Sequence, residues 1–190
     1  METILLLTTS PTAGGNGDTL IAAAAAEAEK CGAQVQVVNI REKEIHFCKA
    51  CYGCAQTGVC VQQDDFMELL RLAHNATGII VEAPIYYNCM AAQMLTVINR
   101  LCCTFACKSY QIGPKKRVGM FLTCTGSEPE EMKRHVRNIL TLPSVSRAIE
   151  AYRTEVFTGC GSAATCKERE DYLARAREVA RWVATGTTPD

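Results

Sequence analysis

The sequence predicts an α/β protein: a three-layer sandwich in which helices cover both faces of a doubly wound, five-stranded parallel sheet. Two observations lead to this fold class. Apolar runs alternate with helix-length amphipathic segments along the whole chain of 190 residues. Three of the apolar runs are nearly continuous, as expected for parallel strands that are covered on both faces. A chain of this length is expected to form one domain, residues 1–190.

Five strands and five helices account for this pattern. The strands are expected at Thr3–Thr9, Gln34–Asn39, Gly78–Ala83, Arg117–Thr123 and Ile149–Phe157. The helices are expected at Thr19–Cys31, Asp65–Asn75, Met90–Thr104, Glu130–Leu140 and Lys167–Thr185. Residues 46–63 form a cysteine-rich loop inserted after the second strand.

Composition excludes several classes of partner. The formal net charge is +0, so the chain has no overall field to attract nucleic acid or an anionic membrane. The longest apolar runs, Ile4–Leu7 and Leu20–Ala26, are far too short to span a bilayer. The N-terminus lacks the basic region and cleavage site of a signal peptide, so we expect a cytoplasmic protein. In that setting, twelve cysteines indicate metal or redox chemistry rather than disulfides.

Four of these cysteines, Cys48, Cys51, Cys54 and Cys60, fall within thirteen residues. Two-residue gaps let successive thiolates face one centre, and the spacing is close to that of iron–sulfur ligands. It fits zinc poorly, because zinc sites usually pair two separate knuckles or a knuckle with histidines. The alternative is a cysteine-rich loop that keeps its shape without metal, and spacing alone does not separate the two.

The first strand is followed by a long loop rich in glycine and hydroxyl groups, from Thr9 to Thr19. The loop lacks the G-x-G-x-x-G pattern of the Rossmann fold. Its absence favours the flavodoxin-like strand order 2-1-3-4-5 over the Rossmann order. Such a loop can wrap a terminal phosphate with backbone N–H groups at a helix N-terminus. The alternative is an ordinary capped helix, with Asp18 or Thr19 as the cap.

Read together with the segment Ala83–Asn88, with Gln93 and with Asn99–Arg100, this loop resembles that of the NADPH-dependent FMN reductase family. The four clustered cysteines, followed by Asp64–Asp65, make the chain similar to the iron–sulfur flavoprotein branch of that family. The resemblance runs from about Ile4 to Thr125.

The resemblance implies FMN at the switch point between the first and third strands. Its phosphate loop would comprise Ser10, Thr12, Asn16, Gly17, Asp18 and Thr19. The isoalloxazine ring would lie between two strand ends, formed by Pro84, Ile85, Tyr86, Tyr87 and Asn88 on one side and by Thr123, Cys124, Thr125 and Gly126 on the other. The family commonly has Asn-Thr at the helix start, where this chain has Asp18-Thr19. An aspartate beside a phosphate repels it unless the carboxylate turns away to cap the helix.

Three functions remain open on the sequence. The first is an FMN-dependent oxidoreductase that takes electrons from NADH or NADPH and passes them to a small-molecule or protein acceptor. The second is an electron carrier in which FMN exchanges electrons with a 4Fe-4S cluster on the four cysteines, and for which the resemblance implies a homodimer or homotetramer. The third is a non-enzymatic module with zinc or an empty cysteine loop.

No catalytic residue can be named, because hydride transfer to a flavin needs orientation more than an acid or base. Seven further cysteines, Cys160 and Cys166 among them, are expected to be small buried hydrophobic residues.

Overall fold

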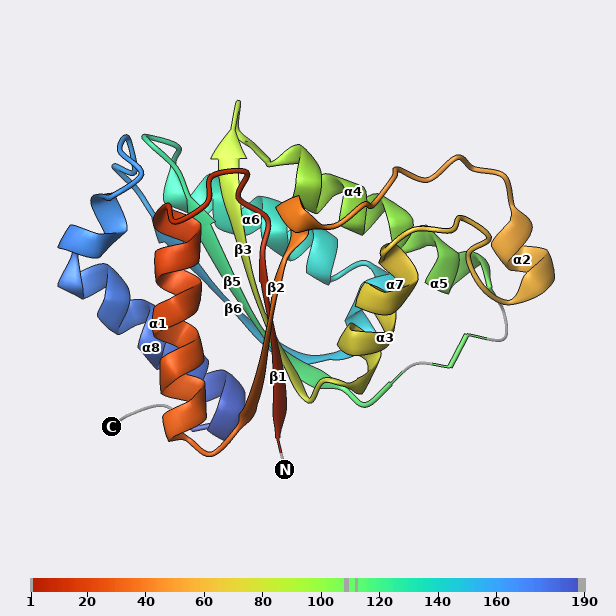
Figure 1. Ribbon diagram of the computed structural model, residues 1–190, viewed down its shortest axis with the longest axis horizontal. Coiled ribbons are helices and arrows are strands. Elements are labelled where there is room, and N and C mark those ends of the chain that lie inside the picture. The colour runs from red at the N-terminus through yellow and green to blue at the C-terminus, as the bar shows by residue number, and fades with distance from the viewer. Residues whose placement is uncertain (1, 108–109, 112, 188–190) are drawn as a thin grey trace.

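The computed structural model describes residues 2–107, 110–111 and 113–187, and in it a twisted parallel sheet lies between two layers of helices (Figure 1). Helices α1 and α8 cover one face, while α3, α4 and α6 lie over the other. The three-layer arrangement predicted from the sequence is confirmed. The ends of the predicted domain, residues 1 and 188–190, lie outside the described residues.

Five strands form the main sheet, in the order β2-β1-β3-β5-β6, and all of them are parallel. They are β1 (Thr3–Thr8), β2 (Gln34–Asn39), β3 (Gly78–Tyr86), β5 (Lys116–Thr123) and β6 (Ile149–Phe157). Counted along these five strands alone, the order is 2-1-3-4-5, which confirms the flavodoxin-like topology.

A sixth, two-residue strand corrects the prediction of five. Strand β4 (Cys89–Met90) pairs antiparallel with the end of β3. The two residues between them, Tyr87 and Asn88, have φ angles of 51° and 58°. Positive φ at both central residues is the geometry of a type I′ hairpin turn. Met90 therefore belongs to a hairpin, not to the predicted helix Met90–Thr104.

The rest of that predicted helix is two helices, α4 (Ala92–Arg100) and α5 (Cys102–Ala106), separated at Leu101. The other long helices follow the amphipathic segments within a few residues: α1 (Asn16–Lys30), α3 (Phe66–Asn75), α6 (Pro129–Leu140) and α8 (Glu170–Thr185). The short ones are η1 (Ile40–Glu42), α2 (Gly53–Thr57), α7 (Pro143–Ser146) and η2 (Thr165–Glu168).

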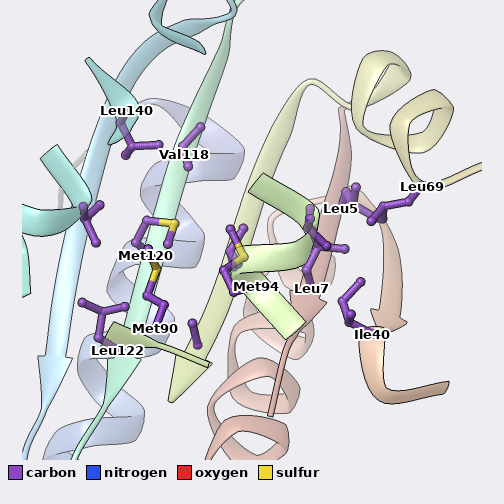
Figure 2. Packing of buried hydrophobic residues seen from close by; sticks show 14 of the residues in the cluster. Leu5, Leu7, Ile40, Leu69, Met90, Met94, Val118, Met120, Leu122 and Leu140 are labelled. Carbon is purple, nitrogen blue, oxygen red and sulfur yellow. The ribbon is translucent and has the colours of Figure 1, made fainter. Parts of the chain in front are cut away.

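Alternate residues of each central strand point to opposite faces and build two cores. On the side of α1 and α8, Ile4, Leu6 and Phe121 are completely buried. Their neighbours along the strands face the other core, which Figure 2 shows around Leu5, Leu7, Met94, Met120 and Leu122. Burial on both faces explains why these strands are continuous apolar runs. Within the described ranges, no helix is both long and apolar enough to cross a membrane.

Candidate functional site: a cleft at the carboxyl ends of the strands

A cleft opens where β1, β3, β5 and β6 end, at the point where the chain leaves β1 and β3 in opposite directions along the sheet. This is the switch point at which α/β sheets bind ligands. Five segments line the cleft: Ser10 and Thr12; Gly15, Asn16 and Gly17; Pro84, Ile85 and Tyr86; Thr123, Cys124 and Thr125; and residues 160–163. Most of the residues predicted to bind FMN are thus brought together.

The N-terminus of α1 forms one end of the cleft. Its N-cap residue is Gly15, and the first backbone hydrogen bond runs from the Thr19 amide to the Gly15 carbonyl, 3.0 Å away. The amides ahead of Thr19 are the donors that the first turn of a helix leaves without an intrahelical partner. Because Gly15, Asn16 and Gly17 line the cleft, this end can receive an anion.

Asp18 turns away from the cleft. Its Oδ2 accepts the Gly14 amide at 2.7 Å, and both carboxylate oxygens accept hydrogen bonds from the Arg41 guanidinium at 2.9 Å. Burial works to raise the pKa of Asp18, but the Arg41 and Gly14 hydrogen bonds outweigh it and hold that pKa below its ordinary value. The expected conflict between this aspartate and a phosphate is therefore relieved by an arginine that the sequence reading did not single out.

Two other residues of the predicted phosphate loop already have partners. The Asn16 side chain donates to the Ser162 carbonyl at 2.7 Å and accepts the Cys166 amide at 2.8 Å, so it ties α1 to the loop after β6. The Thr19 hydroxyl donates to the Gly15 carbonyl at 2.9 Å, and Thr19 does not line the cleft. Ser10, which is buried and lines the cleft, is better placed to meet a ligand.

The aromatic pair after Pro84 is divided by the hairpin turn. Tyr86 lines the cleft, whereas Tyr87 sits in the turn with its side chain fully exposed and outside the lining. The Asn88 side chain accepts a hydrogen bond from the Ser127 hydroxyl at 3.0 Å and borders a separate apolar hollow between β4 and α6. Gly126 also lies outside the cleft's lining. Tyr86 is thus the aromatic ring available to a flat ligand.

Glu82, in β3 directly beneath the cleft, is a completely buried carboxyl group that the sequence reading missed. It accepts hydrogen bonds from the hydroxyls of Thr8 at 3.2 Å and Thr123 at 3.0 Å. Burial raises the pKa of Glu82 to about 7, although the two hydroxyls oppose the shift. A Cβ on Gly17 would lie 2.3 Å from Glu82 Oε2, so any larger residue at this position would force the buried carboxyl to shift.

The loop after β6, residues 158–166, was also missed, and residues 160–163 of it form one wall of the cleft. A general signal was present, because the ends of neighbouring parallel strands meet at one edge of the sheet. The residues of this loop, Gly-Cys-Gly-Ser-Ala, carry no ligand motif of their own.

The cysteine loop lies on the opposite side of the molecule from α1 and α8, with α2 at its tip and α5 beside it (Figure 1). Asn99 and Arg100, at the end of α4, hold its base. The Asn99 side chain accepts the Cys48 amide at 2.7 Å. Arg100 is buried, donates to the His46 carbonyl and to Cys60 Sγ, and pairs with both oxygens of Asp64. The resemblance to iron–sulfur flavoproteins thus includes residues that fix this loop.

The cysteine loop supplies thiols and donors suited to an iron–sulfur cluster, but the thiols do not converge. The Ala50 amide donates to Cys48 Sγ at 3.4 Å, and Arg100 Nη2 donates to Cys60 Sγ at 3.3 Å. Among the residues that the structure describes, however, no three cysteine, histidine or acidic side chains are grouped to hold a metal ion. Burial, with the thiols of Cys60 and Cys54 nearby, raises the pKa of Cys103 to about 12. Cys103 therefore stays a thiol and packs as a small hydrophobic residue.

Comparison with known proteins identifies a family and several relatives of this chain. The family described as NADPH-dependent FMN reductase matches residues 3–152. An iron–sulfur flavoprotein of Archaeoglobus fulgidus is 40% identical over 92 residues, which are 48% of this chain and 42% of that protein. An iron–sulfur flavoprotein of Methanosarcina thermophila is 31% identical over 130 residues, 68% of this chain and 66% of that protein. The matched segments cover less than two thirds of either relative.

Solved structures share the fold at low sequence identity. An NAD(P)H:quinone oxidoreductase from Methanothermobacter marburgensis superposes with a TM-score of 0.71 at 13% identity, covering 95% of this chain and 98% of that one. A flavone reductase gives a TM-score of 0.66 at 19% identity, covering 96% and 62%. These likenesses concern the flavodoxin-like fold alone.

Proposed function

Since the chain belongs to the NADPH-dependent FMN reductase family, we propose that its cleft binds FMN and that the protein passes electrons from NADPH or NADH through FMN to a small-molecule or protein acceptor. One observation carries the proposal: three features lie together at the switch point. They are the N-terminus of α1, the buried Ser10 and the partly exposed aromatic ring of Tyr86. The helix N-terminus and the serine can bind the phosphate of FMN, and the tyrosine offers a flat surface to the isoalloxazine ring.

The phosphate end is assigned to the amides of Gly15, Asn16 and Gly17 with the hydroxyls of Ser10 and Thr12. These groups act as hydrogen-bond donors to a dianion, and Arg41 neutralises the Asp18 carboxylate beside them. A hydrogen bond to a charged group contributes about 1.5–3 kcal/mol, so two or three such donors are enough to distinguish FMN from an unphosphorylated flavin.

The ring end is assigned to Pro84, Ile85 and Tyr86 on one side and to Thr123, Cys124 and Thr125 on the other. Bound FMN would supply the chemistry of hydride acceptance from a nicotinamide. The protein's part is to orient the ring, to offer backbone and hydroxyl groups to its polar edge, and to limit water at the reacting face. This division of labour fits the lining of the cleft, which among the residues that the structure describes includes no carboxylate, histidine or lysine side chain.

Two neighbouring tyrosines test the proposal. Tyr86→Ala should weaken FMN binding and slow bleaching of the flavin absorbance by NADPH or NADH under anaerobic conditions, because Tyr86 lines the cleft. Tyr87→Ala is the matched control, since Tyr87 is the next residue, lies in the turn and is outside the lining. A holoprotein that neither nicotinamide bleaches would reject the reductase function, and equal behaviour of the two variants would remove Tyr86 from the site.

The hydrogen bonds from the cysteine loop to Asn99 and Arg100 favour a second function. In this version, Cys48, Cys51, Cys54 and Cys60 would bind a 4Fe-4S cluster and the protein would be an iron–sulfur flavoprotein. The Ala50 amide and Arg100 donate hydrogen bonds to the sulfurs of Cys48 and Cys60, as cluster ligands require, and the four thiols would have to draw together on loading. Iron and sulfide analysis after anaerobic purification tests it: their absence from the wild type rejects the cluster, as does unchanged iron in Cys54→Ser.

We further propose that the chain forms a homodimer or homotetramer through the side that carries the cysteine loop. On that side, Phe47, Tyr52 and Phe105 are 68%, 71% and 71% exposed. Large exposed apolar side chains gathered near one loop are typical of an interaction surface. Light scattering on the wild type and on the triple serine variant tests this: a monomeric wild type contradicts it.

A further inference from the structure

Two cysteines outside the predicted cluster face each other in the loop after β6. Cys160 Sγ and Cys166 Sγ are 3.9 Å apart, at van der Waals distance for two thiols. The residues between them belong to the wall of the cleft, from Gly161 to Ala163. Both thiols lie at the edge of the core that faces α1 and α8, on the opposite side of the sheet from the cysteine loop.

The two thiols have unequal environments. Cys160 is partly exposed and lines the cleft, whereas Cys166 is completely buried. The hydrogen bond from Cys166 lowers the pKa of Cys160, with help from the Cys124 backbone and the Arg169 charge, despite burial. The same hydrogen bond and burial raise the pKa of Cys166. Cys160 is therefore the accessible nucleophile, and Cys166 is the protected partner.

The loop is held so that the sulfurs stay together. Asn16 accepts the Cys166 amide and donates to the Ser162 carbonyl, which fixes the second half of the loop to α1. The Cys160 amide donates to the Cys124 carbonyl at 2.9 Å, and the Gly159 amide to the Thr125 carbonyl at 2.9 Å, which fixes the first half to the end of β5. The pairing is thus set by hydrogen bonds to two separate elements and does not depend on thiol contact alone.

We propose that Cys160 and Cys166 form a reversible dithiol–disulfide site that reacts with low-molecular-weight disulfides at the mouth of the cleft. The Cys160 thiolate attacks one sulfur of the small disulfide, forming a mixed disulfide and releasing one thiol. The Cys166 sulfur then attacks Cys160 Sγ and gives up its proton to the leaving thiolate, which forms the intramolecular bond and releases the second thiol. The protein dithiol is oxidised by two electrons, and the small disulfide is reduced to two thiols.

Oxidation must reshape the cleft. A disulfide bond is about 2.05 Å long, so the sulfurs have to approach by roughly 2 Å, and the Cys160 side chain, which lines the cleft, moves with its sulfur. Because residues 160–163 form a wall of the cleft, the oxidised and reduced proteins present different sites. On the proposed FMN function, the redox state of this pair therefore alters FMN affinity.

The chain offers a clean assay for the pair. Trypsin cuts after Arg153 and Lys167, and the peptide 154–167 contains Cys160 and Cys166 and no other cysteine. After incubation of the whole protein with oxidised glutathione and alkylation of free thiols, the wild-type peptide should be unalkylated and lighter by two hydrogen atoms than the dithiol form. Dithiothreitol should restore double alkylation.

Three variants make the assay specific. Cys166→Ser should trap glutathione on Cys160, and Cys160→Ser should leave Cys166 unmodified because it is buried. Cys31→Ser, at the far end of α1, should behave as the wild type. A wild-type peptide that keeps two free thiols, or that retains glutathione on Cys160, would overturn the proposal. None of these readouts needs FMN, so they stand or fall separately from the proposed function; a change of FMN affinity on oxidation is measured afterwards by fluorescence titration.

Discussion

At the scale of single residues, Glu82 is the group whose environment differs most from what its type predicts. It occupies a position in β3 between Val81 and Ala83, both of them buried apolar residues. Its carboxyl accepts hydrogen bonds from two threonine hydroxyls, and the Asp18 carboxylate adds to the burial that raises its pKa. The protonated form is therefore favoured in the folded protein, while the unfolded chain titrates near the ordinary value of 4.5.

The Glu82 carboxyl should make the stability of the protein depend on pH. Its stabilising contribution is fully present below about pH 4.5 and is lost as pH rises through about 7, because the folded state holds the proton more tightly. Glu82→Gln mimics the protonated group and does not titrate. As pH rises across this range, the free energy of unfolding of the variant should therefore increase relative to that of the wild type, by on the order of 3 kcal/mol. Urea unfolding at several pH values measures the difference.

The control for this experiment is Glu29→Gln, an exposed substitution on α1, which should follow the wild type at every pH. A difference between Glu82→Gln and the wild type that stays constant from pH 4.5 to 8 would show that the Glu82 carboxyl does not titrate in this interval.

Asp18 and Arg41 form a second pair of residues with a measurable consequence for FMN. Their side chains are only 23% and 15% exposed, so the pair is partly shielded from solvent. Arg41→Gln should leave the Asp18 carboxylate uncompensated beside the phosphate and weaken FMN binding about fivefold, or about 1 kcal/mol. Asp18→Asn keeps an oxygen for the Gly14 amide and removes the charge, so adding it to Arg41→Gln should restore affinity. A double variant that binds no better than Arg41→Gln would contradict this role.

At the scale of elements, the end of α4 is what fixes the cysteine loop to the domain. Arg100 and Asp64 are almost completely buried, and the Arg100 guanidinium also lies 4.5 Å from the centre of the Phe66 ring. Burial opposes the charged form of Asp64, but the Arg100 hydrogen bonds and the His46 and Phe66 amides hold its pKa below the ordinary value. A buried pair of this kind is costly to break from one side only.

Removing one member of this pair should therefore cost more than replacing both. Asp64→Ala should destabilise the protein by about 3–5 kcal/mol, because it leaves a buried guanidinium unpaired. The double variant Asp64→Leu with Arg100→Met should lose clearly less. Lys133→Met, which breaks the exposed pair with Glu130, is the control and should change stability by less than about 1 kcal/mol. Additive costs in the double variant would show that the two charges are not coupled.

At the scale of the whole molecule, the sequence predicted what depends on long, regular patterns. The five strands and the layers of helices follow from apolar runs that are buried on both faces, as at Ile4–Leu7. Strand β4 was missed, because two residues carry no period and Tyr87 is unusual at positive φ. Arg41 and the loop around Cys160 were missed because their place at the cleft depends on contacts between distant segments, such as Arg41 with Asp18 and Asn16 with Cys166.

Comparing FMN with riboflavin tests the central claim, that the cleft binds FMN with its phosphate at the start of α1. In a titration followed by quenching of flavin fluorescence, the apoprotein should bind FMN at least tenfold more tightly than riboflavin, since each hydrogen bond to the phosphate contributes about 1.5–3 kcal/mol. Ser10→Ala should reduce this preference. Equal affinity for the two flavins, or no quenching by either, would contradict the account.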